Sequence, residues 1–131
     1  MSISFANALG MHPDAMIIRE KRTQVLAENI ANADTPGFRA RDIDFQQALS
    51  NAQSKQSQSI RRTHEKHFHI DSSVRKEMQY RQPDQPDTGD GNSVDIHRER
   101  NQFMQNDLAY RTSFQFLDGR ISSLKKAVKG Q

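Results

Sequence analysis

The C-terminal third of the chain carries an apolar repeat, and this repeat constrains the fold more than any other feature. Its steps alternate four and three residues, which is the spacing of a coiled-coil seam. The positions of the repeat are Phe103, Asp107, Tyr110, Phe114, Leu117, Ile121, Leu124 and Val128. Asn92 suits the N-cap, Asp95 the third helical position, and Gly130 the end of the helix. The pattern therefore predicts one helix from Ser93 to Lys129, about 55 Å long.

A second, shorter helix is predicted in the N-terminal third, after a short helical lead. Apolar residues recur there at helical spacing, at Ala15, Met16, Ile18, Val25, Leu26, Ile30 and Ala33. Pro13 suits the first helical position, and the helix must stop before Pro36 because the residue preceding a proline is pushed out of the α region. The helix is then about 30 Å long. Thr35, Pro36, Gly37 and Phe38 form the turn that redirects the chain.

The middle of the chain gives weaker signals. Asp42 to Leu49 reads as a short helical or irregular segment, and the polar run from Ser50 to Ser59 as a mobile loop. Two stretches alternate apolar and polar residues, Phe68 with Ile70 and Met78 with Tyr80. Together they predict a small β-hairpin. Prolines and glycines make Gln82 to Gly91 an extended linker.

The expected organisation is one mainly α unit in three segments. Residues 1–35 form the N-terminal helical segment, residues 36–91 an irregular middle region with a small β-hairpin, and residues 92–131 the long C-terminal helix. The two terminal helices are expected to pair as a coiled coil.

The length mismatch between these helices bears on function. A helix of about 55 Å cannot be covered by a partner of about 30 Å, and hydrophobic residues are only 34% of the chain. The uncovered apolar residues are expected to contact other copies or other proteins. A closed two-helix hairpin, acting as a soluble adaptor or a nucleic-acid-binding protein, is the alternative.

Most site chemistry is disfavoured by the sequence. The formal charge is +3 with basic and acidic residues interleaved, whereas nucleic-acid binding prefers a clustered basic patch. His64, His67 and His69 have metal-ligand residue types, but without cysteine they are expected to pack near the hairpin rather than to bind a metal. No nucleophile elbow or phosphate-binding glycine loop is present. We therefore expect neither an enzyme nor a cofactor.

Two asparagines sit on the first helix, where this residue is unfavourable because its amide competes for backbone hydrogen bonds. Asn29 and Asn32 indicate either amides used for contact or a fraying helix end. They belong to the stretch Leu26 to Phe38, which reads LAENIANADTPGF. This stretch resembles the signature of the bacterial flagellar basal-body rod proteins. The segments Arg39 to Phe45, Tyr80 to Pro86 and Asp90 to Asp95 extend the resemblance, which points to the proximal rod members of that family.

The resemblance implies a structural subunit of a hollow drive shaft, exported through the flagellar type III apparatus without a cleaved signal peptide. The implied partners are other copies of the chain, other proximal rod proteins, the rod-to-MS-ring adaptor, the MS-ring protein and the export apparatus, with no nucleic acid and no membrane insertion. The predicted assembly contacts are Leu26, Asn29, Ile30, Asn32, Phe103, Tyr110, Phe114, Leu117, Ile121 and Leu124.

Overall fold

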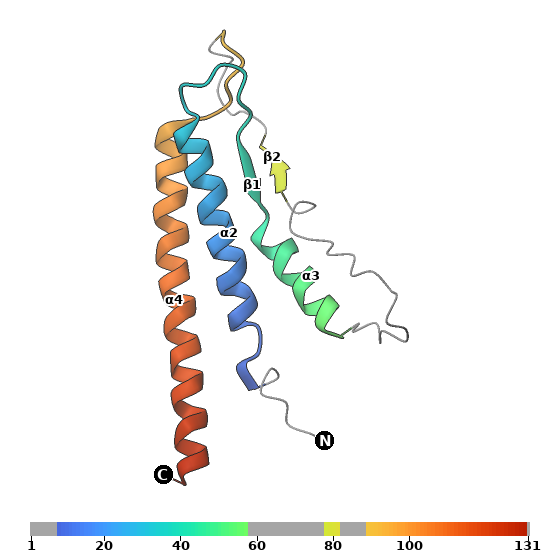
Figure 1. The fold of residues 1–131 in the computed structure, drawn as a ribbon, viewed down its shortest axis with the longest axis vertical. Helices are drawn as coiled ribbons and strands as arrows, with labels where there is room; N and C mark the ends of the chain where they lie inside the picture. The colour runs from blue at the N-terminus through green and yellow to red at the C-terminus, as the bar shows by residue number, and fades with distance from the viewer. Residues whose placement is uncertain (1–7, 58–77, 82–88, 131) are drawn as a thin grey trace, which may run out of the picture.

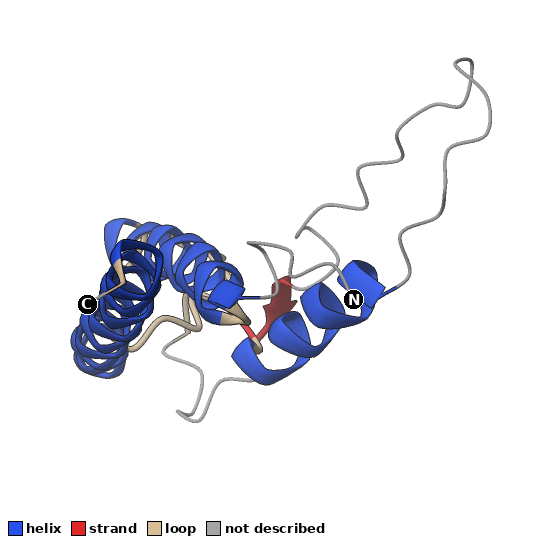
Figure 2. Cartoon of the chain, turned by 90° about the horizontal axis from the view of Figure 1, so that it is seen from below, coloured by secondary structure: helices blue, strands red, loops and turns tan. Residues whose placement is uncertain are grey.

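The structure, a computed structural model, describes residues 8–57, 78–81 and 89–130. Its elements, in order, are α2 (His12–Ala31), β1 (Arg41–Ile43), α3 (Phe45–Ser57), β2 (Met78–Tyr80) and α4 (Ile96–Lys129). Helices α2 and α4 run antiparallel, side by side, and α3 with the two strands lies on the other side of α2 (Figure 1). Viewed along the helices, α2 is the middle layer (Figure 2). The expected mainly α fold with paired terminal helices is confirmed.

Helix α2 begins as the sequence predicts, with Pro13 in its first turn. It ends at Ala31, and Asn32 caps it, since the backbone N–H of Asn32 donates to the carbonyls of Glu28 and Asn29. The side-chain amide of Asn32 donates to the same Glu28 carbonyl at 2.8 Å. The helix therefore stops well before Pro36, as expected.

Helix α4 begins three residues later than predicted, and the prediction of Asn92 as its N-cap was wrong. Asp95 is the cap, because its carboxylate accepts hydrogen bonds from the backbone N–H groups of His97 and Arg98 at 2.9 and 3.2 Å. Gly130 ends the helix at φ 72°, as predicted. With 34 residues, α4 is about 50 Å long and extends well beyond the start of α2 (Figure 1).

The predicted loop from Ser50 was wrong over most of its length, because α3 continues to Ser57. The helix is anchored by apolar residues at helical spacing, Phe45, Ala48, Leu49 and Ala52, which pack on α2 and β1. Gln58 and Ser59 lie outside the described residues.

The two strands form a small antiparallel sheet, but not the predicted hairpin. Met78 to Tyr80 is a strand, as predicted, and its partner is β1, with Ile43 opposite Met78 and Arg41 opposite Tyr80. Ile43, which lies opposite Met78, is buried in the core beside Ile18 and Val25 of α2. Phe68 and Ile70 lie outside the described residues, as do His64, His67 and His69.

The hydrophobic core lies between α2 and the middle region. Ile18, Val25, Ile43 and Ala48 form its centre. The contact between α2 and α4 is different in character, since the fully buried side chains there include the polar residues Asn29, Glu99 and Asn106. The two terminal helices are therefore joined by polar contacts to an unusual extent.

Candidate functional site: a polar junction and the surface of α4

Four segments of the chain meet at one cluster of polar side chains, which we call the polar junction. Its members are Arg22, Asn29, Asp42, Arg81, Glu99 and Gln102. They come from α2, from β1, from the residue after β2, and from the first two turns of α4. Segments far apart in the sequence are thereby fastened to one another at a single point.

Asp42 is the anion at the centre of the junction. Arg22 donates two hydrogen bonds to its carboxylate, from Nε to Oδ1 at 2.8 Å and from Nη2 to Oδ2 at 2.9 Å. Nη2 of Arg81 donates to Oδ2 at 2.6 Å. Burial by itself raises the pKa of Asp42, but the hydrogen bond and charge of Arg22, with further hydrogen bonds from Arg81 and the backbone N–H of Ile43, outweigh it and hold this pKa below its ordinary value. The aspartate is therefore ionised and links α2 to the segment after β2.

Glu99 is the second anion, and it is only 1% exposed. Nη1 of Arg81 donates to its Oε1, and the side-chain amide of Asn29 donates to its Oε2 at 3.0 Å. A buried carboxylate is costly unless a counter-charge and hydrogen bonds accompany it. Arg81 supplies the charge, so it is the residue on which both anions of the junction depend.

Asn29 joins α2 to the small sheet. Its Nδ2 donates to the backbone carbonyl of Arg41 at 2.7 Å, and its Oδ1 accepts from the backbone N–H of the same residue at 3.1 Å. Asn29 is fully buried. Of the two interpretations left open by the sequence, contact is the correct one for Asn29, and the contact shown lies within the chain.

Further polar contacts continue along the α2–α4 interface. Nη2 of Arg22 donates to Oε1 of Gln102 at 2.8 Å. About one turn further along α4, the side-chain amide of Asn106 donates to the carbonyl of Arg19 and to Oγ1 of Thr23, both at 2.9 Å. Each contact joins one position along α2 to one position along α4. Together, the contacts therefore specify the axial register of the two helices.

This interface also corrects the predicted seam. Asn106 is buried and occupies the position that the repeat assigned to Asp107, which is half-buried and pairs with Arg111 at 2.9 Å. Glu99, Phe103, Asn106 and Tyr110 keep the alternating four-and-three spacing and face α2. Only this one position of the repeat was assigned one residue off, because both Asn106 and Asp107 fit the spacing between Phe103 and Tyr110 and neither is apolar.

The turn after α2 is fastened to the loop before α4. The side-chain amide of Asn92 donates to three backbone carbonyls between Asn32 and Thr35, at 2.7 to 3.1 Å. The backbone N–H of Gly37 donates to the carbonyl of Asp90 at 2.9 Å, and that of Ser93 to the carbonyl of Phe38 at 3.0 Å. The predicted turn residues thus fix where α4 begins.

The predicted assembly residues fall into three groups by exposure. Leu26 and Asn29 are fully buried and offer no surface to a second copy. Phe114 and Ile121 are 54% and 43% exposed. The remaining residues are half-buried: Ile30, Asn32, Phe103, Tyr110, Leu117 and Leu124. An assembly contact at the exposed and half-buried positions stays a prediction.

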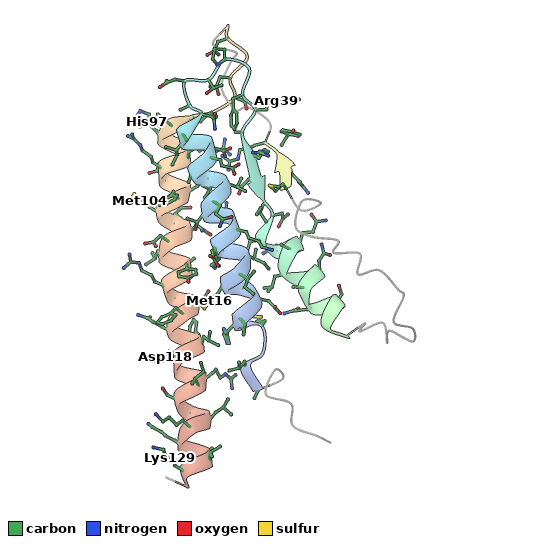
Figure 3. All side chains as sticks on the ribbon, viewed as in Figure 1. Met16, Arg39, His97, Met104, Asp118 and Lys129 are labelled. Carbon is green, nitrogen blue, oxygen red and sulfur yellow. The ribbon has the colours of Figure 1, made fainter. Side chains whose placement is uncertain are left out.

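More apolar surface is exposed on α4 than the repeat accounts for. Met104, Leu108 and Phe116 are 60 to 69% exposed, and Met104 points away from α2 (Figure 3). Leu108 and Phe116 border an open hollow of about 520 Å³ between α2, α3 and α4, which Met11 and Leu49 also line. Exposed apolar area of this extent on one helix is typical of a protein-contact surface.

The junction itself was not predicted, although part of its signal is present. Glu99 lies four residues before Phe103 and seven before Asn106, which places it on the seam. Nothing local pairs Arg22 with Asp42 or Arg81 with Glu99. In the described part of the chain, no three histidine or acidic side chains are grouped as metal ligands would be.

Comparison with known proteins gives one consistent family. The model of the family described as "Flagella basal body rod protein" matches residues 11–39. The chain is 53% identical over 131 residues to flagellar basal body rod protein FlgB of Aeromonas hydrophila, covering 100% of this chain and 99% of that protein. It is 41% identical over 128 residues to FlgB of Cereibacter sphaeroides, covering 97% and 98%. FlgB of Escherichia coli K12 is 40% identical over 129 residues, with 93% of each chain covered.

Proposed function

The chain belongs to the FlgB family of flagellar basal body rod proteins, and on that premise we propose that it polymerises through its terminal helices into the hollow proximal rod. A rod protein of this family is a structural protein and not an enzyme. The alternative of a soluble adaptor or a nucleic-acid-binding protein is therefore set aside.

One observation carries the proposed mode of assembly: α4 outreaches α2 and exposes apolar side chains along its length. Phe114, Ile121 and Val128 recur every seven residues and are 43 to 89% exposed. Burying a large apolar side chain contributes about 1.5 to 3 kcal/mol. Packing these residues against neighbouring subunits supplies a driving force for assembly that the single chain leaves unused.

The polar junction suits the mechanical role of a rod. A drive shaft transmits torque only if the elements within each subunit do not slide past one another. The hydrogen bonds of the polar junction hold α2, α4 and the small sheet in one axial register. In the proposal, torque passes through helix contacts between subunits while each subunit keeps its own hairpin register.

Other partners follow from position in the basal body. We propose contacts with the other proximal rod proteins, the rod-to-MS-ring adaptor and the MS-ring protein, and export by the flagellar type III apparatus without a cleaved signal peptide. In residues 8–57 and 89–130, no helix combines the length and hydropathy that a bilayer span requires.

The test is complementation of a strain that lacks the rod protein, with Phe114→Asp compared with the matched variant Gln115→Asp. Both residues are exposed and adjacent, so neither change disturbs the hairpin interior. We expect Phe114→Asp to be exported but absent from purified basal bodies, and Gln115→Asp to support swimming. Normal rods with Phe114→Asp would contradict assembly through this face of α4.

A further inference from the structure

The last part of α4 extends past the helix that it pairs with. The rings of His12 and Phe116 stack with their centroids 5.9 Å apart, so the first turn of α2 lies opposite Phe116. Figure 3 places Lys129 far beyond the start of α2. We call Asp118 to Lys129 the overhang, and it is about 18 Å long.

The overhang is both apolar and basic. Ile121 and Val128 are 43% and 89% exposed, and they continue the row that begins at Phe114. The charged residues of the overhang are Asp118, Arg120, Lys125, Lys126 and Lys129. Cations therefore predominate beside the apolar row, and a complementary surface must offer small or apolar side chains together with acids.

The outer face of α2 has that composition. This face consists of the exposed residues of α2, which are Ile17, Glu20, Gln24, Ala27, Glu28 and Ala31. Ile17 is 50% exposed, and both charged members of this face are acidic. Glu28 is bonded to Arg41 at 2.7 Å, whereas for Glu20 no hydrogen bond or ion pair is present among the described residues. From Ile17 to Ala31 the face is about 21 Å long, close to the length of the overhang.

We propose that the overhang of one copy packs along the outer face of α2 in a second copy, an inference that rests on the proposed rod function. Within one chain the two surfaces cannot meet, because the overhang continues the axis of α4 beyond the start of α2 (Figure 1). A contact between two different surfaces of identical chains gives a ring if its rotation closes and an open helical polymer if it does not, and the proposed rod requires the open form. The apolar row supplies affinity, and the charges set orientation.

Cross-linking tests the contact directly, because the chain has no cysteine. One variant carries Gln24→Cys, at the centre of the outer face of α2, and the other carries Lys125→Cys, on the overhang. The two variants are made in copies with different tags, exported together, and oxidised in isolated basal bodies. We expect a disulfide between the two tagged copies. The control pairs Gln24→Cys with Gln115→Cys, which is exposed on α4 but outside the overhang, and should give none.

Charge exchange provides a second readout. Lys125→Glu with Lys129→Glu should lower incorporation into basal bodies about two- to fivefold, as expected for exposed ion pairs. Adding Glu20→Lys should restore incorporation. Loss without restoration would overturn the pairing of these charges.

Every other outcome is informative. A disulfide of Lys125→Cys to a different protein alone, or no inter-chain product at all, would overturn the second-copy contact, while the presence of both tagged copies in the basal body would leave the rod function standing. Absence of the wild-type chain from basal bodies would instead contradict the proposed function itself.

Discussion

The side-chain amide of Asn29 forms both backbone hydrogen bonds of Arg41, as a neighbouring strand would. The distances are 2.7 Å to the carbonyl and 3.1 Å from the N–H. One helical side chain thus extends the two-stranded sheet onto α2. Because the same amide also donates to Glu99, its contribution cannot be replaced by an apolar residue of similar size.

Replacing Asn29 with leucine should therefore destabilise the chain by about 3 kcal/mol, because it leaves two backbone groups of Arg41 and one oxygen of Glu99 without their partner. The measurement is the free energy of unfolding in urea. The control is Asn32→Ala, whose amide bonds are near the surface and should contribute about 1 kcal/mol or less. Equal effects of the two changes would show that the contact with β1 is energetically unimportant.

Arg81 presents a sharper case, because it is the counter-charge of two anions. Arg81→Met should cost about 3 to 5 kcal/mol, since it leaves Glu99 buried and unpaired with any cation shown in the described residues. Adding Glu99→Gln should recover part of this loss, because a neutral amide needs no counter-charge. A double-mutant cycle measures the coupling. Strict additivity of the two changes would contradict an ion pair between Arg81 and Glu99.

The sequence predicts the elements that depend on local patterns, and it does not predict those that depend on contacts between residues far apart in the chain. Helices α2 and α4 have local periodicity and punctuation at Pro13 and Gly130, and both were predicted. The second half of α3 was missed because no apolar residue follows Ala52, while the core contacts of this helix come from Phe45, Ala48, Leu49 and Ala52. The pairing of Ile43 with Met78 is long-range, and no local pattern specifies it.

The residues of α4 that face α2 show a second limit of prediction from sequence. The seven-residue interval from Phe103 to Tyr110 fits either Asn106 or Asp107, and periodicity analysis, which reads only apolar residues, chose Asp107 as a break in the stripe. Asn106 can be buried because its side-chain amide donates hydrogen bonds to the backbone carbonyl of Arg19 and to the hydroxyl of Thr23 on α2. Such a position is recognisable only when its partners are known. The same holds for the junction, whose arginines and carboxylates read as ordinary surface charges in the sequence.

Acid should weaken the fold through Asp42. Its pKa in the folded chain lies below the ordinary value of 3.8, so its stabilising contribution is fully present above the unfolded-state pKa. That contribution is lost as the pH falls below about 4 and through the folded-state value. The free energy of unfolding is measured from pH 7 to pH 3 in the wild type and in Asp42→Asn. We expect the difference between the two proteins to shrink over the acidic part of this range. A constant difference would show that the pKa of Asp42 is the same in the folded and unfolded chain, and would contradict its stabilisation by the two arginines.

Leu117→Asp should prevent rod assembly and swimming. Leu117 is half-buried, on the side of α4 that faces α2 and near the point where α2 begins, so a charge there disrupts the seam and the surface at which neighbouring subunits are proposed to pack. Under the export route proposed above, secretion should continue, and the variant should appear in the culture medium. Gln115→Asp, an exposed position on α4 outside the overhang, is the control. Motile cells carrying Leu117→Asp would mean that the half-buried seam residues contribute nothing essential to the polymer, and that assembly depends on the exposed row from Phe114 to Val128 alone.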